Sequence, residues 1–146
     1  MTKTVAIASD HAGFAYKEML KAEIESAGYK VVDLGTNGVE SVDYPDFGYK
    51  AADSVAAGEA DLGVIICGSG VGISIAANRN PKIRAALCFN GEMAKLARMH
   101  NDANILALGA RIIDEETAKI CLHEFLNTEF EGGRHKLRVE KLSKNN

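Results

Sequence analysis

The stretch that decides the fold is residues 62–74, LGVIICGSGVGIS. A continuous apolar run that ends at Cys67 is typical of a buried strand, and the apolar residues that resume at Ile73 indicate a helix start. The glycines of residues 68–72 leave the turn between this strand and this helix with few side chains. Backbone N–H groups and the helix dipole can therefore face an anion. A plain tight turn with Cys67 as a small core residue fits equally well, and this stretch alone leaves both interpretations open.

The bulk composition describes an ordinary globular chain of 146 residues, 47% hydrophobic and 25% charged, and we expect one domain over residues 1–146. With a net charge of −3 and interspersed charges, neither nucleic-acid binding nor membrane-surface binding is indicated. The first apolar run, residues 5–8, is far shorter than a signal-peptide core or a membrane span of about 20 residues, so we expect a cytoplasmic location. Three cysteines without metal-ligand spacing predict reduced thiols and no metal site.

Short apolar strands alternate with helical patterns along the chain. The expected strands lie at residues 4–8, 30–34, 61–67, 84–88 and 105–108. Between them, apolar spacing such as that of Tyr16, Leu20 and Ile24 predicts helices, and a helix is expected over residues 46–57, with Pro45 at its start. Strands without polar alternation are typical of burial on both faces. We therefore expect an α/β fold: a three-layer α/β/α sandwich with a Rossmann-like, doubly wound, five-stranded parallel sheet.

Polar residues that follow the strands are the candidate site residues, because ligands bind outside the carboxyl ends of an open parallel sheet. These candidates are Asp10, His11, Tyr44, Cys67, Ser69 and Arg111. The glycine loop lacks the Lys and Ser/Thr of a P-loop, and it follows the third strand with the wrong spacing for a dinucleotide fingerprint. No nucleotide cofactor is expected.

The Cys67 thiol lies beside a predicted helix start, a position that favours a thiolate. A nucleophile, a general base and an inert core thiol all remain open for Cys67, whereas Cys88 is expected to be a core residue. His100 lies on the apolar face of its predicted helix but within a polar cluster. Arg134 and Arg138 are four positions apart, which suits either a phosphate clamp or a solvated basic face. One reaction fits a set made of a thiol base, a histidine acid, an arginine clamp and an anion-stabilising loop. It is proton abstraction next to a carbonyl in a small phosphorylated substrate.

An ordered set of motifs resembles the type B ribose-5-phosphate isomerases, in the sugar-phosphate isomerase family that also contains galactose-6-phosphate isomerase. The resemblance covers essentially the whole chain. Its motifs are SDHAGF at 9–14, DYP at 43–45, CGSGVGIS at 67–74, IRA at 83–85, HNDAN at 100–104, GAR at 109–111 and EGGRH at 131–135. The resemblance implies a cofactor-free isomerisation between ribose 5-phosphate and ribulose 5-phosphate through an enediolate.

The resemblance also implies a role for each candidate. His100, together with Asp10, assists opening of the furanose ring, and Cys67 moves the proton between C2 and C1. The groups implied to stabilise the enediolate oxygens are the Ser69 hydroxyl and the loop residues Gly68, Gly70, Val71 and Gly72. The implied phosphate ligands are His11, Arg134 and Arg138, with Arg111 as a further candidate. The implied sugar contacts are Tyr44 and Asn101.

Members of this family are homodimers or dimers of dimers with sites at the subunit interface, so some residues act across chains, and the sequence does not assign which. Some members use a downstream glutamate instead of the cysteine, but here residues 74–76 are Ser-Ile-Ala, which favours the thiol. Others carry Thr in place of Ser69, which keeps the hydroxyl. Two competing functions remain: isomerisation of a six-carbon sugar phosphate, allose 6-phosphate or galactose 6-phosphate, and a non-catalytic phosphosugar-binding module.

Overall fold

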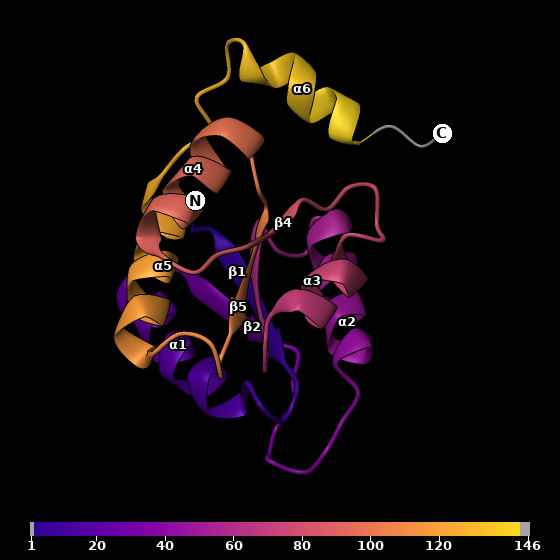
Figure 1. The fold of residues 1–146 in the computed structure, drawn as a ribbon, viewed down its shortest axis with the longest axis vertical. Coiled ribbons are helices and arrows are strands. Elements are labelled where there is room, and N and C mark those ends of the chain that lie inside the picture. The colour runs from indigo at the N-terminus through magenta and orange to yellow at the C-terminus, as the bar shows by residue number, and fades with distance from the viewer. Residues whose placement is uncertain (1, 144–146) are drawn as a thin grey trace.

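The computed structural model describes residues 2–143, and its five strands form one parallel sheet in the order β2-β1-β3-β5-β4 (Figure 1). The strands are β1 (Thr4–Ser9), β2 (Lys30–Asp33), β3 (Leu62–Cys67), β4 (Ala85–Leu87) and β5 (Ile105–Gly109). The helices are α1 (Phe14–Ser26), α2 (Tyr44–Ala56), α3 (Val71–Ala77), α4 (Gly91–Asn101), α5 (Glu115–Asn127) and α6 (His135–Leu142). Helices α1, α4 and α5 cover one face and α2 and α3 the other, which confirms the expected three-layer sandwich.

The core lies on both faces of the three central strands. Ile7, Ile66 and Leu108 pack under α1, α4 and α5, whereas Ile65 and Ile105 pack under α2 and α3. The expectation that every strand is buried on both faces is wrong for the two edge strands. In β2 only one of four residues is even partly buried, and all three residues of β4 are partly buried, because each pairs with a neighbour on one side only.

The strand boundaries lie within one residue of the sequence expectation, and the start of one helix differs by two. Helix α2 begins at Tyr44 rather than at Asp46, since Pro45 occupies its first turn, where the missing N–H costs nothing. Strand β4 is shorter than expected, with three residues. No helix within residues 2–143 is both long and apolar enough to cross a membrane.

The connections of the sheet define where a ligand should bind. From β1 the chain moves outward to β2, and from β3 it moves to the opposite side, so the winding direction reverses between β1 and β3. In such sheets the crevice outside the carboxyl ends at the reversal is the usual ligand site. Here those two strand ends carry Asp10 and Cys67.

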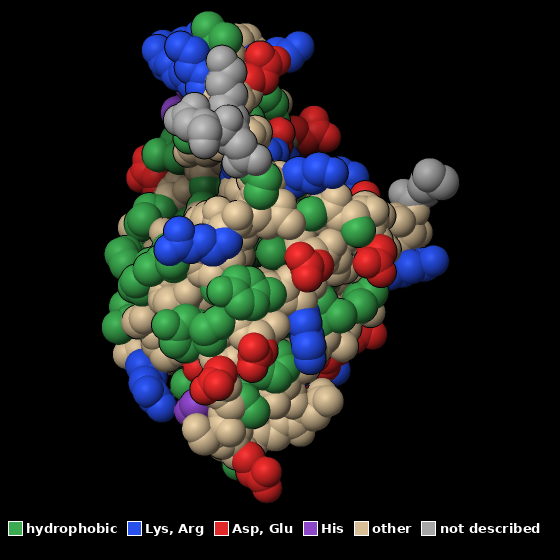
Figure 2. Space-filling model, turned by 90° about the vertical axis from the view of Figure 1, so that its right-hand side faces the viewer, with side chains coloured by type: hydrophobic (Ala, Val, Ile, Leu, Met, Phe, Trp, Pro, Cys, Tyr) green, Lys and Arg blue, Asp and Glu red, His purple; other side chains and the backbone are tan. Residues whose placement is uncertain are grey.

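Helix α6 stands apart from both layers, beyond the end of the sheet at which the strands begin (Figure 1). It packs against α4, and its own sequence is rich in Lys and Arg, whose side chains gather at the top of Figure 2. The other end of the molecule carries the turns that lead from β1 into α1 and from β3 into α3. Helix α6, with its basic side chains, and the glycine loop of residues 68–72 therefore lie at opposite ends of the sheet.

Candidate active site

Cys67 is the last residue of β3, and 4% of its surface is exposed. The backbone N–H of Gly70 donates a hydrogen bond to the Cys67 sulfur at 3.2 Å. Gly70 can do so because it adopts a φ of +80°, in a place where a Cβ would lie 2.5 Å from Leu87 Cδ1. The glycine loop thus places a hydrogen-bond donor on the thiol. Cys88 differs, since burial raises the pKa of its thiol to about 12, which agrees with its expected role in the core.

The loop amides divide into two groups. The N–H groups of Gly70 and Val71 are bound within the chain, by the Cys67 sulfur and by the Ser69 hydroxyl oxygen at 3.1 Å. In the part of the chain that the structure describes, no acceptor binds the N–H groups of Gly68, Ser69 or Gly72. The Ser69 hydroxyl accepts from Val71, so its own proton is free to point elsewhere. The donors open to an oxyanion are therefore fewer than the sequence indicated.

Asp10 lies next to Cys67 because β1 and β3 are neighbours in the sheet. Its N–H donates to the carbonyl of Ile66 at 3.2 Å, and its carboxylate accepts the N–H of Gly13 at 3.1 Å. Asp10 is 6% exposed. A Cβ on Gly13 would lie 2.7 Å from the Ile66 carbonyl oxygen, so only glycine lets the start of α1 approach β3 this closely. Within residues 2–143 no hydrogen bond engages the second carboxylate oxygen of Asp10, which leaves this oxygen for a substrate.

His11 follows Asp10 and is partly buried. Its Nδ1 accepts the backbone N–H of Val42 at 3.1 Å. In a neutral imidazole one nitrogen accepts and the other donates, so this bond assigns the proton to Nε2. The loop before α2 therefore prepares His11 as a hydrogen-bond donor.

Tyr44 and Arg111 lie against the glycine loop. A Cβ on Gly72 would lie 2.5 Å from the Tyr44 ring, so Gly72 makes room for this tyrosine. Gly68 is next to Arg111, though less tightly: the Gly68 carbonyl accepts the Arg111 N–H at 2.9 Å, and a Gly68 Cβ would lie 3.3 Å from the guanidinium. We call this set the rim cluster; its members are Asp10, His11, Tyr44, Cys67, Gly68, Ser69, Gly70, Val71, Gly72 and Arg111.

The remaining predicted site residues form a second group at the other end of the sheet. We call it the arm cluster; its members are His100, Asn101, Arg134 and Arg138. His100 and Asn101 end α4. Both arginines are exposed: Arg134 directly precedes α6, and Arg138 lies in the middle of it. Strand β5 separates the two clusters, and its five residues span about 16 Å at 3.3 Å per residue. Within one chain, the structure does not bring the arm cluster to the rim cluster.

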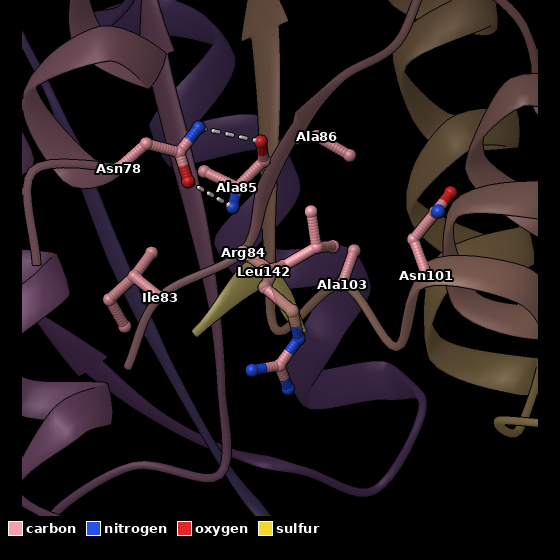
Figure 3. Close-up of a pocket in the computed structure, with 8 residues that line it drawn as sticks. All are labelled: Asn78, Ile83, Arg84, Ala85, Ala86, Asn101, Ala103 and Leu142. Atoms are coloured by element: carbon pink, nitrogen blue, oxygen red, sulfur yellow. Dashed lines mark hydrogen bonds between the residues drawn. The ribbon is translucent and has the colours of Figure 1, made fainter. Parts of the chain in front are cut away.

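A cavity of about 400 Å³ lies beside the outer edge of β4 (Figure 3). Among the predicted site residues it is lined only by Asn101, and its other polar side chains are engaged elsewhere. The Asn78 amide pairs with both backbone groups of Ala85 at 2.8 and 3.0 Å, and Arg84 binds Asp102. The lining offers neither a thiol nor a histidine. This cavity therefore does not carry the chemistry of the rim cluster.

The fold and the candidate site together indicate a class: an α/β enzyme with acid–base groups and hydrogen-bond donors for a small anion gathered at the reversal point of a parallel sheet. More particularly, the chain belongs to the Ribose/Galactose Isomerase family, which matches residues 5–142.

Relatives of known name and structure cover nearly the whole chain. Ribose-5-phosphate isomerase B of Escherichia coli is 45% identical over 141 residues, which are 97% of this chain and 95% of that protein. A ribose-5-phosphate isomerase B structure from Clostridium thermocellum is 51% identical, with a TM-score of 0.94 over 96% of this chain and 95% of that one. The Trypanosoma brucei type B ribose 5-phosphate isomerase is 44% identical, with a TM-score of 0.95 over 98% of both chains. The resemblance that the sequence motifs indicated is thereby confirmed.

Proposed function

We propose that this chain interconverts ribose 5-phosphate and ribulose 5-phosphate. Its relatives support this substrate, since proteins named ribose-5-phosphate isomerase B match the chain over nearly its full length. The observation that carries the proposal is the Cys67 sulfur, held by the Gly70 N–H at the reversal point of the sheet and next to Asp10. Neither six-carbon substrates nor a purely binding role is favoured by the relatives.

The first step is opening of the furanose ring. His100 donates a proton to the ring oxygen O4 while the bond between C1 and O4 breaks. Asp10 accepts the proton of the O1 hydroxyl, and the electron pair of that O–H bond becomes part of the new C1 carbonyl. The product is the open-chain aldehyde, and the proton count is unchanged.

The second step moves hydrogen between carbons. The Cys67 thiolate removes the C2 proton, the C2–H electron pair forms a C1=C2 double bond, and the carbonyl pair moves onto O1. This oxyanion accepts hydrogen bonds from the Ser69 hydroxyl and from the free N–H groups of Gly68 and Gly72. Cys67 then returns its proton to C1, and Asp10 returns to O1 the proton that it took in the first step. The O2 hydroxyl gives its proton to His100 and becomes the ketone carbonyl, so all three side chains regain their starting state. No electron leaves the substrate.

These steps need both clusters, which one chain keeps at opposite ends of β5. We therefore infer a two-fold symmetric homodimer, alone or within a dimer of dimers, in which the arm cluster of each copy serves the rim cluster of the other. The phosphate then lies between His11 and Arg111 of one copy and Arg134 and Arg138 of the other, as four donors suit a dianion. Exposed Leu137 of α6 and Ile75 of α3 are apolar side chains that such contact would cover.

A panel of five- and six-carbon aldose phosphates tests the function with purified protein. We expect the highest kcat/KM on ribose 5-phosphate, and in Cys67→Ala a loss of at least about 10³-fold with unchanged circular dichroism. Cys121→Ala is the matched control, because Cys121 is also a buried thiol but lies in α5, and it should keep its turnover. Near-normal turnover in Cys67→Ala contradicts the proposed base. A clear preference for a six-carbon phosphate contradicts the proposed substrate, and binding without turnover contradicts catalysis.

A cytoplasmic location stays a prediction. It is supported by the three thiols, all of which are free and buried.

A further inference from the structure

His135, the first residue of α6, is a buried histidine with no evident task. It is 5% exposed, in contrast to the exposed Arg134 and Arg138 on either side of it. Among the described residues its Nε2 has no hydrogen-bond partner, and the nearest carboxylate oxygen, from Glu131, is 3.7 Å away. Buried polar atoms are nearly always paired, so an unpaired one needs a reason.

The imidazole of His135 stacks on the imidazole of His100. The ring centroids are 4.3 Å apart and the ring planes differ by 18°. The segment before α6 is fastened to the end of α4, because the Glu131 N–H donates to the Met99 carbonyl at 3.0 Å. One face of the partly exposed His100 ring is therefore covered by a ring that the fold holds in place.

The surroundings keep His135 neutral. Burial lowers the pKa of His135, and the nearby His100, Arg134 and Arg138 lower it further, against the opposing effect of Glu131. A neutral and buried imidazole does not exchange protons readily with a substrate. His135 is thus suited to hold a ring in place rather than to act as an acid or base itself.

A metal site is the other chemistry that these residues suggest. Donor atoms of His100, Glu131 and His135 lie within 4.8 Å of one another. However, nearly parallel rings point their in-plane lone pairs side by side, whereas zinc requires them to converge at about 2.0–2.1 Å from one point. Arg134 and Arg138 add positive charge beside the cluster, which opposes a bound cation. The geometry favours stacking over ligation.

We propose that His135 is a positioning residue for ring opening: its imidazole fixes the plane of the His100 ring, so that the free edge of His100 meets the ring oxygen of the sugar. The proposal rests on the function proposed above, because it needs His100 to act on a closed furanose. It assigns to His135 no contact with the phosphate, since its ring is buried while the arginines beside it are exposed.

The chemistry of the two substrates separates ring opening from proton transfer. Ribose 5-phosphate is a furanose in water, whereas ribulose 5-phosphate has its O5 phosphorylated and stays open-chain. Net conversion in either direction therefore includes the ring step, whereas exchange of the C1 hydrogen of ribulose 5-phosphate with solvent needs only proton transfer. A residue that acts through His100 should slow net isomerisation and spare this exchange.

The experiment compares His135→Leu, which fills the site without a ring, with His135→Phe, which keeps a flat ring but no nitrogen. We expect His135→Leu to lower forward kcat/KM at least about 10-fold and to leave the exchange of the ribulose 5-phosphate C1 hydrogen with deuterated solvent within about 2-fold, while His135→Phe retains most forward activity. His123→Ala, which changes a histidine on α5 that pairs with Glu23, is the matched control with wild-type rates of isomerisation and of exchange. Sedimentation at the assay concentration checks that each variant keeps the wild-type oligomeric state.

Three results overturn the proposal. Equal losses of isomerisation and of C1 hydrogen exchange, or a raised KM for both substrates, assign His135 to substrate binding. Unchanged forward activity in His135→Leu assigns it no role in ring opening. Loss of forward activity in His135→Phe equal to that in His135→Leu shows that the nitrogens, not the ring plane, are needed. Wild-type protein that fails to convert ribose 5-phosphate would instead refute the proposed function itself, which the same assay reveals first.

Discussion

Gly70 is the position in the glycine loop that is least able to accept a side chain. Its φ is +80°, a region that side chains rarely adopt, and a Cβ there would meet three neighbouring groups. The distances are 2.5 Å to Leu87 Cδ1, 2.9 Å to the carbonyl carbon of Leu108 and 3.0 Å to the N of Gly109. Two of these three atoms belong to the backbone of the central sheet and cannot move aside. Gly70→Ala should therefore disturb the fold and the site together.

The cost of Gly70→Ala has two parts. Holding alanine in the left-handed region costs roughly 1–2 kcal/mol. Forcing a methyl group into an occupied site costs a further 1–3 kcal/mol, typically. Together these predict a loss of about 2–5 kcal/mol in the free energy of unfolding, a large share of the roughly 5–15 kcal/mol of an ordinary domain. Any shift that relieves the contact also moves the Gly70 N–H away from the Cys67 sulfur, so kcat should fall.

Gly28→Ala separates the two parts. Gly28 also has a positive φ, +94°, but a Cβ there meets nothing within 4 Å. Urea unfolding of both variants is measured at one protein concentration, together with kcat. Gly28→Ala should lose only the backbone part of the free energy of unfolding and should keep wild-type turnover. If the two variants lose stability equally within about 0.5 kcal/mol, the reasoning about the contact with the sheet is refuted.

Two further predictions concern buried groups. Burial raises the thiol pKa to about 12 for Cys88 and to about 11 for Cys121, so both should stay unlabelled by iodoacetamide in native protein at pH 8.5 and react on unfolding; native labelling of either would contradict this burial. Lys17→Met removes the fully buried ammonium that binds Asp33 at 2.7 Å, and it should cost about 2–3 kcal/mol, less than a fully orphaned buried charge because Lys21 still pairs with Asp33. Partial burial alone would raise the pKa of Asp33, but hydrogen bonds from Lys17, Lys21 and Gly35 bring it below 3.8. This stabilisation is present above pH 3.8 and is lost as the pH falls through the lowered value, so acid unfolding followed by circular dichroism should depend less on pH in Lys17→Met than in wild type.

The fold could be predicted from the sequence because its signals are local. An apolar run followed by a glycine loop reports a buried strand and a turn without knowledge of the rest of the chain, as residues 62–74 did. The exposure of β2 and β4 could not be predicted in this way. Their apolar sequences resemble those of central strands, and only the strand order places them at the edges of the sheet.

The candidate site also has one part that local sequence signals predict and one part that they do not. The rim cluster was accessible to sequence reasoning, because strand ends of a parallel sheet meet at one edge. The arm cluster was singled out by residue type and by resemblance, but its distance from the rim depends on how α4 and α6 pack. The burial of His135 and its stacking on His100 join segments that are 35 positions apart, and no local pattern encodes them.

The most direct test of the shared site mixes two inactive variants, Cys67→Ala and His100→Ala, under conditions in which copies exchange. In a mixed two-fold dimer, one site receives both substitutions and the other receives intact Cys67 and intact His100. Random pairing of equal amounts should therefore restore about one quarter of wild-type turnover of ribose 5-phosphate. A mixture that stays as inactive as its two parents would contradict the account, because Cys67 and His100 would then have to act within one chain.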